Sequence, residues 1–285
     1  MRASGPVGSG GPDGGPPPLI AVAHGSSDPR AAASVGALLD LVRWRAEAAG
    51  FPGLDVRAAY LGHAAPGLPQ ALADAASRDE EAVILPLLLT AAYHSKADIP
   101  GVLREARAAR PRLAVRYGQP LGPHPLLLRA LERRLGEIPG RGEFGPEQTA
   151  VVLAAAGSSD RAAAGVITDL AASWRAWRGW RAVLPAYASA AAPTPADAVA
   201  AARRAGARKV LVATYLLSPG LFADQIRRDC LAAGAAGVSP VLGAAPEIAD
   251  VVLGRYAETL AAGHAAAAGW PGLRSRDRLR CAAAR

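Results

Sequence analysis

Cysteine, aromatic residues and long apolar runs are all scarce in this chain. Two cysteines, Cys230 and Cys281, are too few for a disulfide framework, and their spacing excludes a cysteine-based zinc site. No stretch reaches the roughly 18 consecutive apolar residues that would span a bilayer. The Gly/Pro-rich residues 1–18 lack the apolar core of a signal peptide. We therefore expect a cytoplasmic protein with no membrane association.

Positive charge is in excess, but it is not concentrated as nucleic-acid binding requires. The net charge is +8, and the segment RSRDRLRCAAAR at 274–285, with five arginines and one aspartate, contributes +4 of it. The remainder is spread over the chain without a basic stripe or an RNA-binding aromatic signature. We expect no nucleic-acid partner, whereas a mildly basic surface suits a small polyanionic substrate.

What the sequence does contain is a regular alternation of short apolar runs and alanine-rich amphipathic segments. This rhythm is typical of βαβ units around a parallel sheet. The predicted strands are 19–23, 54–60, 82–88, 113–117, 150–154, 181–186, 209–213 and 238–242. The predicted helices include 30–49, 67–78, 97–110, 124–136 and 246–262.

The alternation begins again after a linker, and the second part of the sequence repeats the first. AVAHGSSDPRAAASV at 21–35 aligns with LAAAGSSDRAAAGVI at 153–167, and 84–99 resembles 212–226. We predict an α/β protein of two similar doubly wound parallel-sheet lobes with a cleft between them. The predicted divisions are a disordered tail 1–18, an N-terminal lobe 19–138 that carries the site, a linker 139–149, a C-terminal lobe 150–263 and a basic tail 264–285.

Two histidines distinguish the copies. His24 aligns with Ala156 and His94 aligns with Phe222, so the second copy has an apolar residue at both positions. If the imidazoles were needed only for the fold, the second copy, which has the same fold, would be less expected to lack both of them. The first copy is therefore predicted to carry the chemistry.

The predicted topology brings these histidines together. With strand order 2-1-3-4, the loops after the first and third strands diverge at the switch point where such sheets bind ligands. Two imidazoles without a third His or Cys ligand favour an open, transient divalent-metal site. Gly25, Ser26 and Ser27 could donate hydrogen bonds to an anionic group of the substrate. Asp98 is equally suited to capping the next helix or to orienting a histidine.

The same residues resemble a known family. HGS after the first strand, the segment PLLLTAAYHSKADIP at 86–100 and YGQPLGPHP at 117–125 are similar to the sirohydrochlorin chelatases, the class II metal chelatases of sirohaem and cobalamin synthesis. The resemblance extends over about residues 19–260. It implies two α/β lobes with a tetrapyrrole between them, and insertion of Fe²⁺ or Co²⁺ into sirohydrochlorin, with His24 and His94 as the catalytic metal ligands and no permanent cofactor.

One position departs from the family pattern. Where the family often has an acidic residue after the second strand, this chain has Gly62, followed by His63. Either a third metal-linked group is missing or His63 replaces it. The plainer interpretation is that His63 is a solvated loop residue, since most polar loop residues are solvated. We expect His124 to begin a helix and Lys96 to be a weak candidate for binding substrate carboxylates.

Three functions remain open on the sequence alone. The first is a chelatase, and the second is a non-catalytic carrier of a tetrapyrrole or metal with the same fold. The third is a phosphate-transfer or hydrolytic enzyme that uses His24 as the nucleophile, for which the nearby chain supplies only Arg30. The sequence does not select among Fe²⁺, Co²⁺ and Ni²⁺, all of which accept imidazole. Because both lobes lie in one chain, we expect a monomer.

Overall fold

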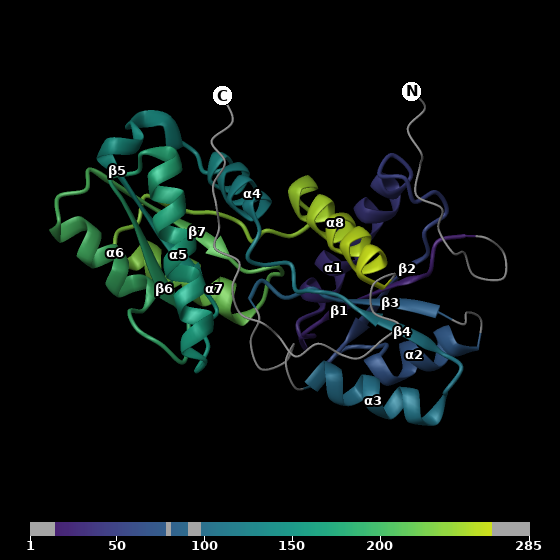
Figure 1. Ribbon diagram of the computed structural model, residues 1–285. Coiled ribbons are helices and arrows are strands. Elements are labelled where there is room, and N and C mark those ends of the chain that lie inside the picture. The colour runs from purple at the N-terminus through teal and green to yellow at the C-terminus, as the bar shows by residue number, and fades with distance from the viewer. Residues whose placement is uncertain (1–14, 78–80, 91–97, 264–285) are drawn as a thin grey trace, which may run out of the picture.

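The computed structural model describes residues 15–77, 81–90 and 98–263, which form two parallel sheets with helices on both faces (Figure 1). The first repeat contains β1 (Leu19–Ala23), α1 (Pro29–Ala46), β2 (Val56–Tyr60), α2 (Leu68–Ala76), β3 (Glu81–Pro86), α3 (Ile99–Ala109), β4 (Ala114–Tyr117) and α4 (Pro125–Gly136). The second contains β5 (Thr149–Ala155), α5 (Arg161–Arg178), β6 (Ala182–Tyr187), α6 (Pro195–Arg204), β7 (Lys209–Tyr215), α7 (Leu221–Ala232), β8 (Gly237–Val238) and α8 (Pro246–Gly263).

Both sheets have the predicted strand order. The first runs β2-β1-β3-β4 and the second β6-β5-β7-β8, with every neighbouring pair parallel. All five residues of β1 are buried, because helices cover both faces of the sheet. Leu19, Ala21 and Ala23 face one core and Ile20 and Val22 the other, as the two-residue period of a strand requires. The prediction of two doubly wound α/β lobes is therefore confirmed.

The last helix of each repeat packs on the sheet of the other repeat (Figure 1). Helix α8 contacts α1, β3 and β4, and Tyr256 on α8 meets Phe51 edge to face at 4.9 Å. Helix α4 contacts β7, and Glu132 on α4 accepts a 2.8 Å hydrogen bond from Nε1 of Trp174 on α5. This exchange joins helices of both repeats in one large hydrophobic core.

Two local predictions differ from the structure. The strand predicted at 238–242 is the two-residue β8, because Pro240 has no N–H for a longer ladder and Ser239 pairs with Thr214 partly through its side chain. The three-residue spacing of tryptophan in SWRAWRGW at 173–180 predicts one packed helix face, but Trp174, Trp177 and Trp180 do not share one. Trp174 is fully buried, Trp177 is half exposed, and Trp180 lies beyond Gly179, which ends α5 in a left-handed conformation.

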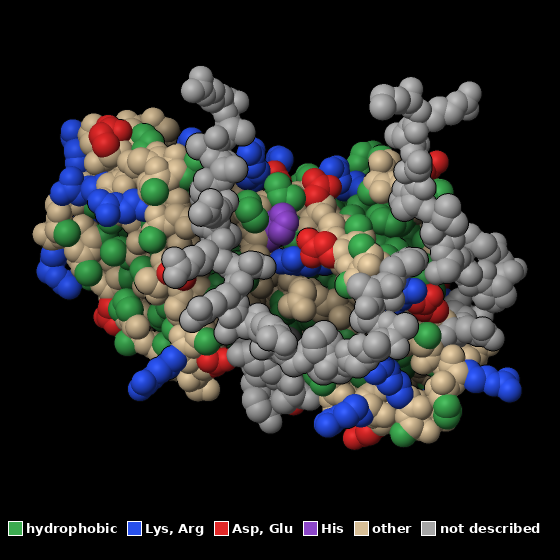
Figure 2. Space-filling model, viewed as in Figure 1, with side chains coloured by type: hydrophobic (Ala, Val, Ile, Leu, Met, Phe, Trp, Pro, Cys, Tyr) green, Lys and Arg blue, Asp and Glu red, His purple; other side chains and the backbone are tan. Residues whose placement is uncertain are grey.

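The surface of the described residues is mixed in charge. Figure 2 shows Lys and Arg side chains scattered among Asp and Glu side chains over both repeats on the visible face. Among the helices in the described part of the chain, none combines the length and the hydropathy needed to cross a bilayer.

Candidate functional site

The loop between β1 and α1 places His24 at the carboxyl edge of the first sheet. His24 follows the last residue of β1 and is exposed. The loop is held by local hydrogen bonds: Ser26 Oγ accepts from the N–H of Asp28 at 3.1 Å, and Asp28 Oδ1 accepts from the N–H of Arg30 at 2.9 Å. Asp28 is thus the N-cap of α1, which also has proline at its first position. The imidazole therefore stands on a fixed strand-to-helix turn.

Gly25 brings a second loop against this turn. Its φ is +88°, and a Cβ at this position would lie 1.7 Å from the carbonyl oxygen of Gly62. The N–H of Gly62 donates to the carbonyl of His24 at 3.1 Å. Only glycine fits here, because a side chain would meet both backbone strain and backbone atoms. The loop after β2, including His63 with its φ of +60°, therefore lies beside His24.

The second repeat has the same turn without the imidazole. Gly157 has a φ of +95° and would place a Cβ 1.9 Å from the carbonyl oxygen of Ser189. Ser158 and Asp160 make the hydrogen bonds that Ser26 and Asp28 make in the first repeat. Features common to both copies therefore build the turn, whereas His24 and His63, whose counterparts in the second repeat are Ala156 and Ala190, are not needed for it.

The geometry of His24 indicates which of its ring nitrogens suits a metal ion. Nδ1 lies 3.3 Å from the carbonyl oxygen of Gly25, which can only accept a hydrogen bond. In the neutral tautomer that makes this contact, Nδ1 carries the proton and Nε2 has the lone pair. A backbone carbonyl that fixes the tautomer is the usual partner of a histidine that binds a metal through its other nitrogen.

Three contacts bring the carboxyl edges of the two sheets together, and we call this region the inter-repeat edge. Arg30 Nη2 lies 2.6 Å from Asp224 Oδ2 on α7, and Tyr215 at the end of β7 donates a 3.1 Å hydrogen bond to the carbonyl of Leu89. A Cβ at Gly220 would lie 4.0 Å from Ser26 Oγ. The His24 turn of the first repeat therefore faces the start of α7 in the second repeat.

The ion pairs at this edge are charged at neutral pH. Hydrogen bonds from Arg30 lower the pKa of Asp28 and of Asp224 below the ordinary aspartate value. The guanidinium of Arg30 is thus shared between two carboxylates, one from each repeat. No local sequence signal reveals this pairing, because 194 residues separate its partners.

The structure does not describe every residue that the sequence predicts for the site. His94 and Lys96 lie outside the described residues. Ser26 is used within its own turn, Ser27 is exposed, and Asp98 occupies the N-cap position of α3 without a side-chain capping hydrogen bond. Within 15–77, 81–90 and 98–263, no three His, Cys, Asp or Glu side chains gather as a metal site would require.

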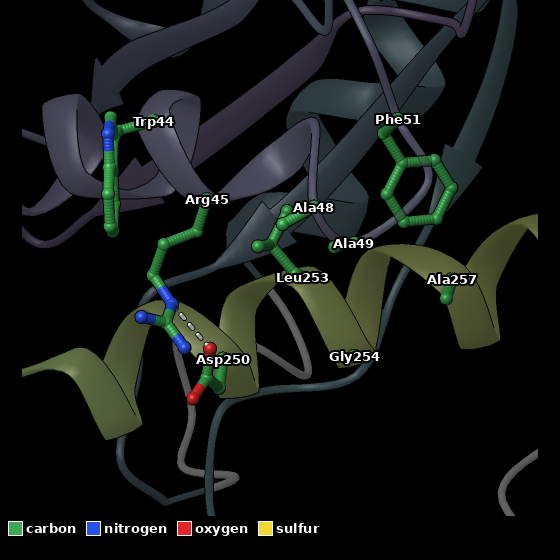
Figure 3. Close-up of a pocket in the computed structure, with 9 residues that line it drawn as sticks. All are labelled: Trp44, Arg45, Ala48, Ala49, Phe51, Asp250, Leu253, Gly254 and Ala257. Atoms are coloured by element: carbon green, nitrogen blue, oxygen red, sulfur yellow. Dashed lines mark hydrogen bonds and ion pairs between the residues drawn. The ribbon is translucent and has the colours of Figure 1, made fainter.

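Two cavities lie far from the inter-repeat edge. The first, of about 490 Å³, is formed by the end of α1 and by α8, with the Arg45–Asp250 ion pair between Trp44 and Phe51 (Figure 3). Trp44 is about 20 Å along α1 from its first turn, since a helix rises about 1.5 Å per residue. The second, of about 520 Å³, adjoins Trp177 near the end of α5. Both cavities lie beside the carboxyl ends of helices, from which the chain continues to the amino end of the next strand.

Comparison with known proteins agrees with this arrangement. Sirohydrochlorin ferrochelatase of Priestia megaterium is 30% identical over 146 residues, 51% of this chain and 54% of that protein. Sirohydrochlorin cobaltochelatase of the same organism is 29% identical over 147 residues, 52% of this chain and 48% of the relative. The matched regions thus span about half the length of these curated relatives.

Solved structures share the fold over most of the chain. SirB from Bacillus subtilis with Fe³⁺ has a TM-score of 0.73 at 22% identity, covering 87% of this chain and 97% of that one. The structure described as CbiX, the terminal enzyme of sirohaem biosynthesis in denitrifying bacteria, has a TM-score of 0.60 at 20% identity, covering 85% and 98%. The CbiX family model matches twice, at residues 18–138 and 150–259, which confirms the internal repeat. This chain therefore belongs to the CbiX family.

Proposed function

We propose that this protein inserts a divalent metal ion, Fe²⁺ or Co²⁺, into sirohydrochlorin, and that it does so as a cytoplasmic monomer. The observation that carries the proposal is the asymmetry of the two turns: His24 stands at the switch point of the first sheet, and Ala156 stands at the same point of the second. Family membership and the names of the relatives supply the substrate and the reaction.

The proposed chemistry needs a weak metal site and a proton acceptor. His24 would offer Nε2 to the ion, and His94, which follows β3 in the sequence, would supply the second imidazole. Two pyrrole N–H protons must leave as the metal enters the macrocycle. A neutral imidazole is suited to accept a proton at neutral pH. Two ligands also release the ion more readily than a closed four-ligand site.

The structure supports the two other functions, a hydrolase and a tetrapyrrole carrier, to different extents. A hydrolase that uses His24 would need a cation for an anionic substrate, and Arg30 is already engaged by Asp28 and Asp224. A tetrapyrrole carrier would use the same fold and the same surface without turnover. Since the family's acidic position is Gly62 here, the carrier is the alternative that the experiment must separate from the enzyme.

The test follows the visible absorption of anaerobic sirohydrochlorin with Co²⁺ or Fe²⁺, with and without the protein. We expect the protein to accelerate loss of the metal-free bands, and His24→Ala and His94→Ala each to abolish that acceleration. His124→Asn is the matched control, because it removes an imidazole whose side chain is used in capping α4 and leaves a side chain that can still cap. A spectral shift without turnover would identify a carrier and contradict the proposed reaction.

A further inference from the structure

The first turn of α7 exposes two large apolar side chains. Leu221 is 77% exposed, more than any other large hydrophobic residue in the described part of the chain, and Phe222 is 39% exposed. Most leucines of the described sheets and helices are buried. Adjacent exposed apolar side chains at a loop-to-helix junction are typical of a surface that a ligand covers.

These side chains lie at the inter-repeat edge. Gly220, directly before Leu221, approaches Ser26 of the His24 turn, with 4.0 Å between its Cβ position and Ser26 Oγ. Asp224, three residues after Leu221, pairs with Arg30 of the first repeat. Residues three apart share a helix face. Leu221 is therefore on the side of α7 that meets the first repeat, close to the turn that carries His24.

The internal repeat gives independent support. In the alignment of 84–99 with 212–226, Phe222 takes the position of His94. The second repeat thus has apolar residues at both positions where the first has an imidazole, although its sheet and its glycine turn are the same. The loop between β1 and α1 and the start of α7 lie at the same edge. The two repeats therefore present different chemistry to one ligand: the imidazole of His24 from the first and apolar side chains from the second.

We propose that Leu221 and Phe222 form an apolar seat for one face of the tetrapyrrole macrocycle, opposite the face that His24 approaches. The inference rests on the proposed function, since it takes sirohydrochlorin as the ligand. A tetrapyrrole has two broad apolar faces and a rim of carboxylates, so an apolar seat holds the ring without competing for the metal. Removal of the macrocycle face from water would stabilise the complex in proportion to the area covered.

The experiment measures binding of metal-free sirohydrochlorin by fluorescence titration of the full-length protein. Leu221→Ala and Phe222→Ala are each expected to raise the Kd by about five- to ten-fold, as loss of about one to two buried methylene-sized groups implies. Leu231→Ala is the matched control, because Leu231 is 43% exposed on the same helix, ten residues from Leu221. Its Kd should equal that of the unsubstituted protein. Circular dichroism checks that all three variants are folded.

The outcomes separate this inference from the proposed function. If the unsubstituted protein inserts metal but Leu221→Ala and Phe222→Ala bind the macrocycle as well as Leu231→Ala does, the apolar seat is refuted and the chelatase proposal stands. If the unsubstituted protein neither binds sirohydrochlorin nor accelerates insertion, both are refuted. A change of molecular mass in Leu221→Ala with an unchanged Kd would assign this surface to a second copy of the chain and would also refute the seat.

Discussion

The glycine turn beside His24 offers a sharp test, because the second repeat contains its own control. At Gly25, alanine would adopt a φ of +88° and place its Cβ 1.7 Å from the carbonyl oxygen of Gly62. A left-handed conformation costs an L-residue about 1–2 kcal/mol, and forcing atoms into packed structure costs about 1–3 kcal/mol. Gly25→Ala should therefore lower the free energy of unfolding by about 2–5 kcal/mol.

Gly25→Ala should also reduce the activity of the molecules that remain folded. Relief of the clash moves Gly62 away, and with it the N–H that binds the carbonyl of His24. A shift of about 1 Å in a catalytic group costs up to about 100-fold in rate, so we expect a 10- to 100-fold loss of kcat per folded molecule.

Gly157→Ala has the same strain, with a φ of +95° and a contact of 1.9 Å to Ser189, but no imidazole beside it. Urea unfolding and anaerobic insertion kinetics, each at a temperature where the variants are folded, compare the pair. Equal losses of kcat in Gly25→Ala and Gly157→Ala would refute the assignment of the chemistry to the first turn.

Two further predictions concern stability. His124 Nδ1 accepts a hydrogen bond from the N–H of Leu126 at 3.2 Å, and burial lowers the pKa of His124 below 6.5. The unfolded state then binds more protons, so stability is fully present above pH 6.5 and falls as the pH drops through the lowered pKa. His124→Asn should keep the cap and reduce this acid loss in urea titrations from pH 7.5 to 5; an unchanged pH profile would contradict the assignment. Glu132→Ala leaves the buried Nε1 of Trp174 without its acceptor and should cost about 1–3 kcal/mol, whereas Glu132→Gln should cost less. Equal unfolding midpoints for the two variants would contradict this role.

The sheets were predictable because their signals are local and periodic. Runs such as LIAVA at 19–23 are apolar throughout, as strands buried on both faces must be, and β1 has the predicted bounds. The order 2-1-3-4 was supposed as one of the orders that right-handed connections between parallel strands allow, and it is the order observed. The repeat was visible because the glycine-serine turn recurs at 25–26 and 157–158, where the backbone itself requires glycine.

How the two repeats pack against each other was not predictable from local and periodic signals. Nothing local to residues 246–263 indicates that α8 packs on the first sheet, because an amphipathic helix carries no signal for which sheet it covers. The pairing of Arg30 with Asp224 depends on that relation, as does the approach of Gly220 to Ser26. For the site, the sequence predicted His24 and its turn, while the position of Leu221 beside them required the structure.

The exchanged helices join the two repeats by packing outside the inter-repeat edge. Since α4 covers the second sheet and α8 the first, separation of the repeats would expose apolar surface on both, including Trp174 and Tyr256, which are fully buried. Such burial stabilises by roughly 25 cal/mol per Å² of apolar area. The two carboxyl edges are therefore held facing each other by packing remote from them. His24 is exposed and its counterpart in the second repeat is Ala156, so this one position can change from imidazole to apolar side chain without loss of the architecture that both repeats share.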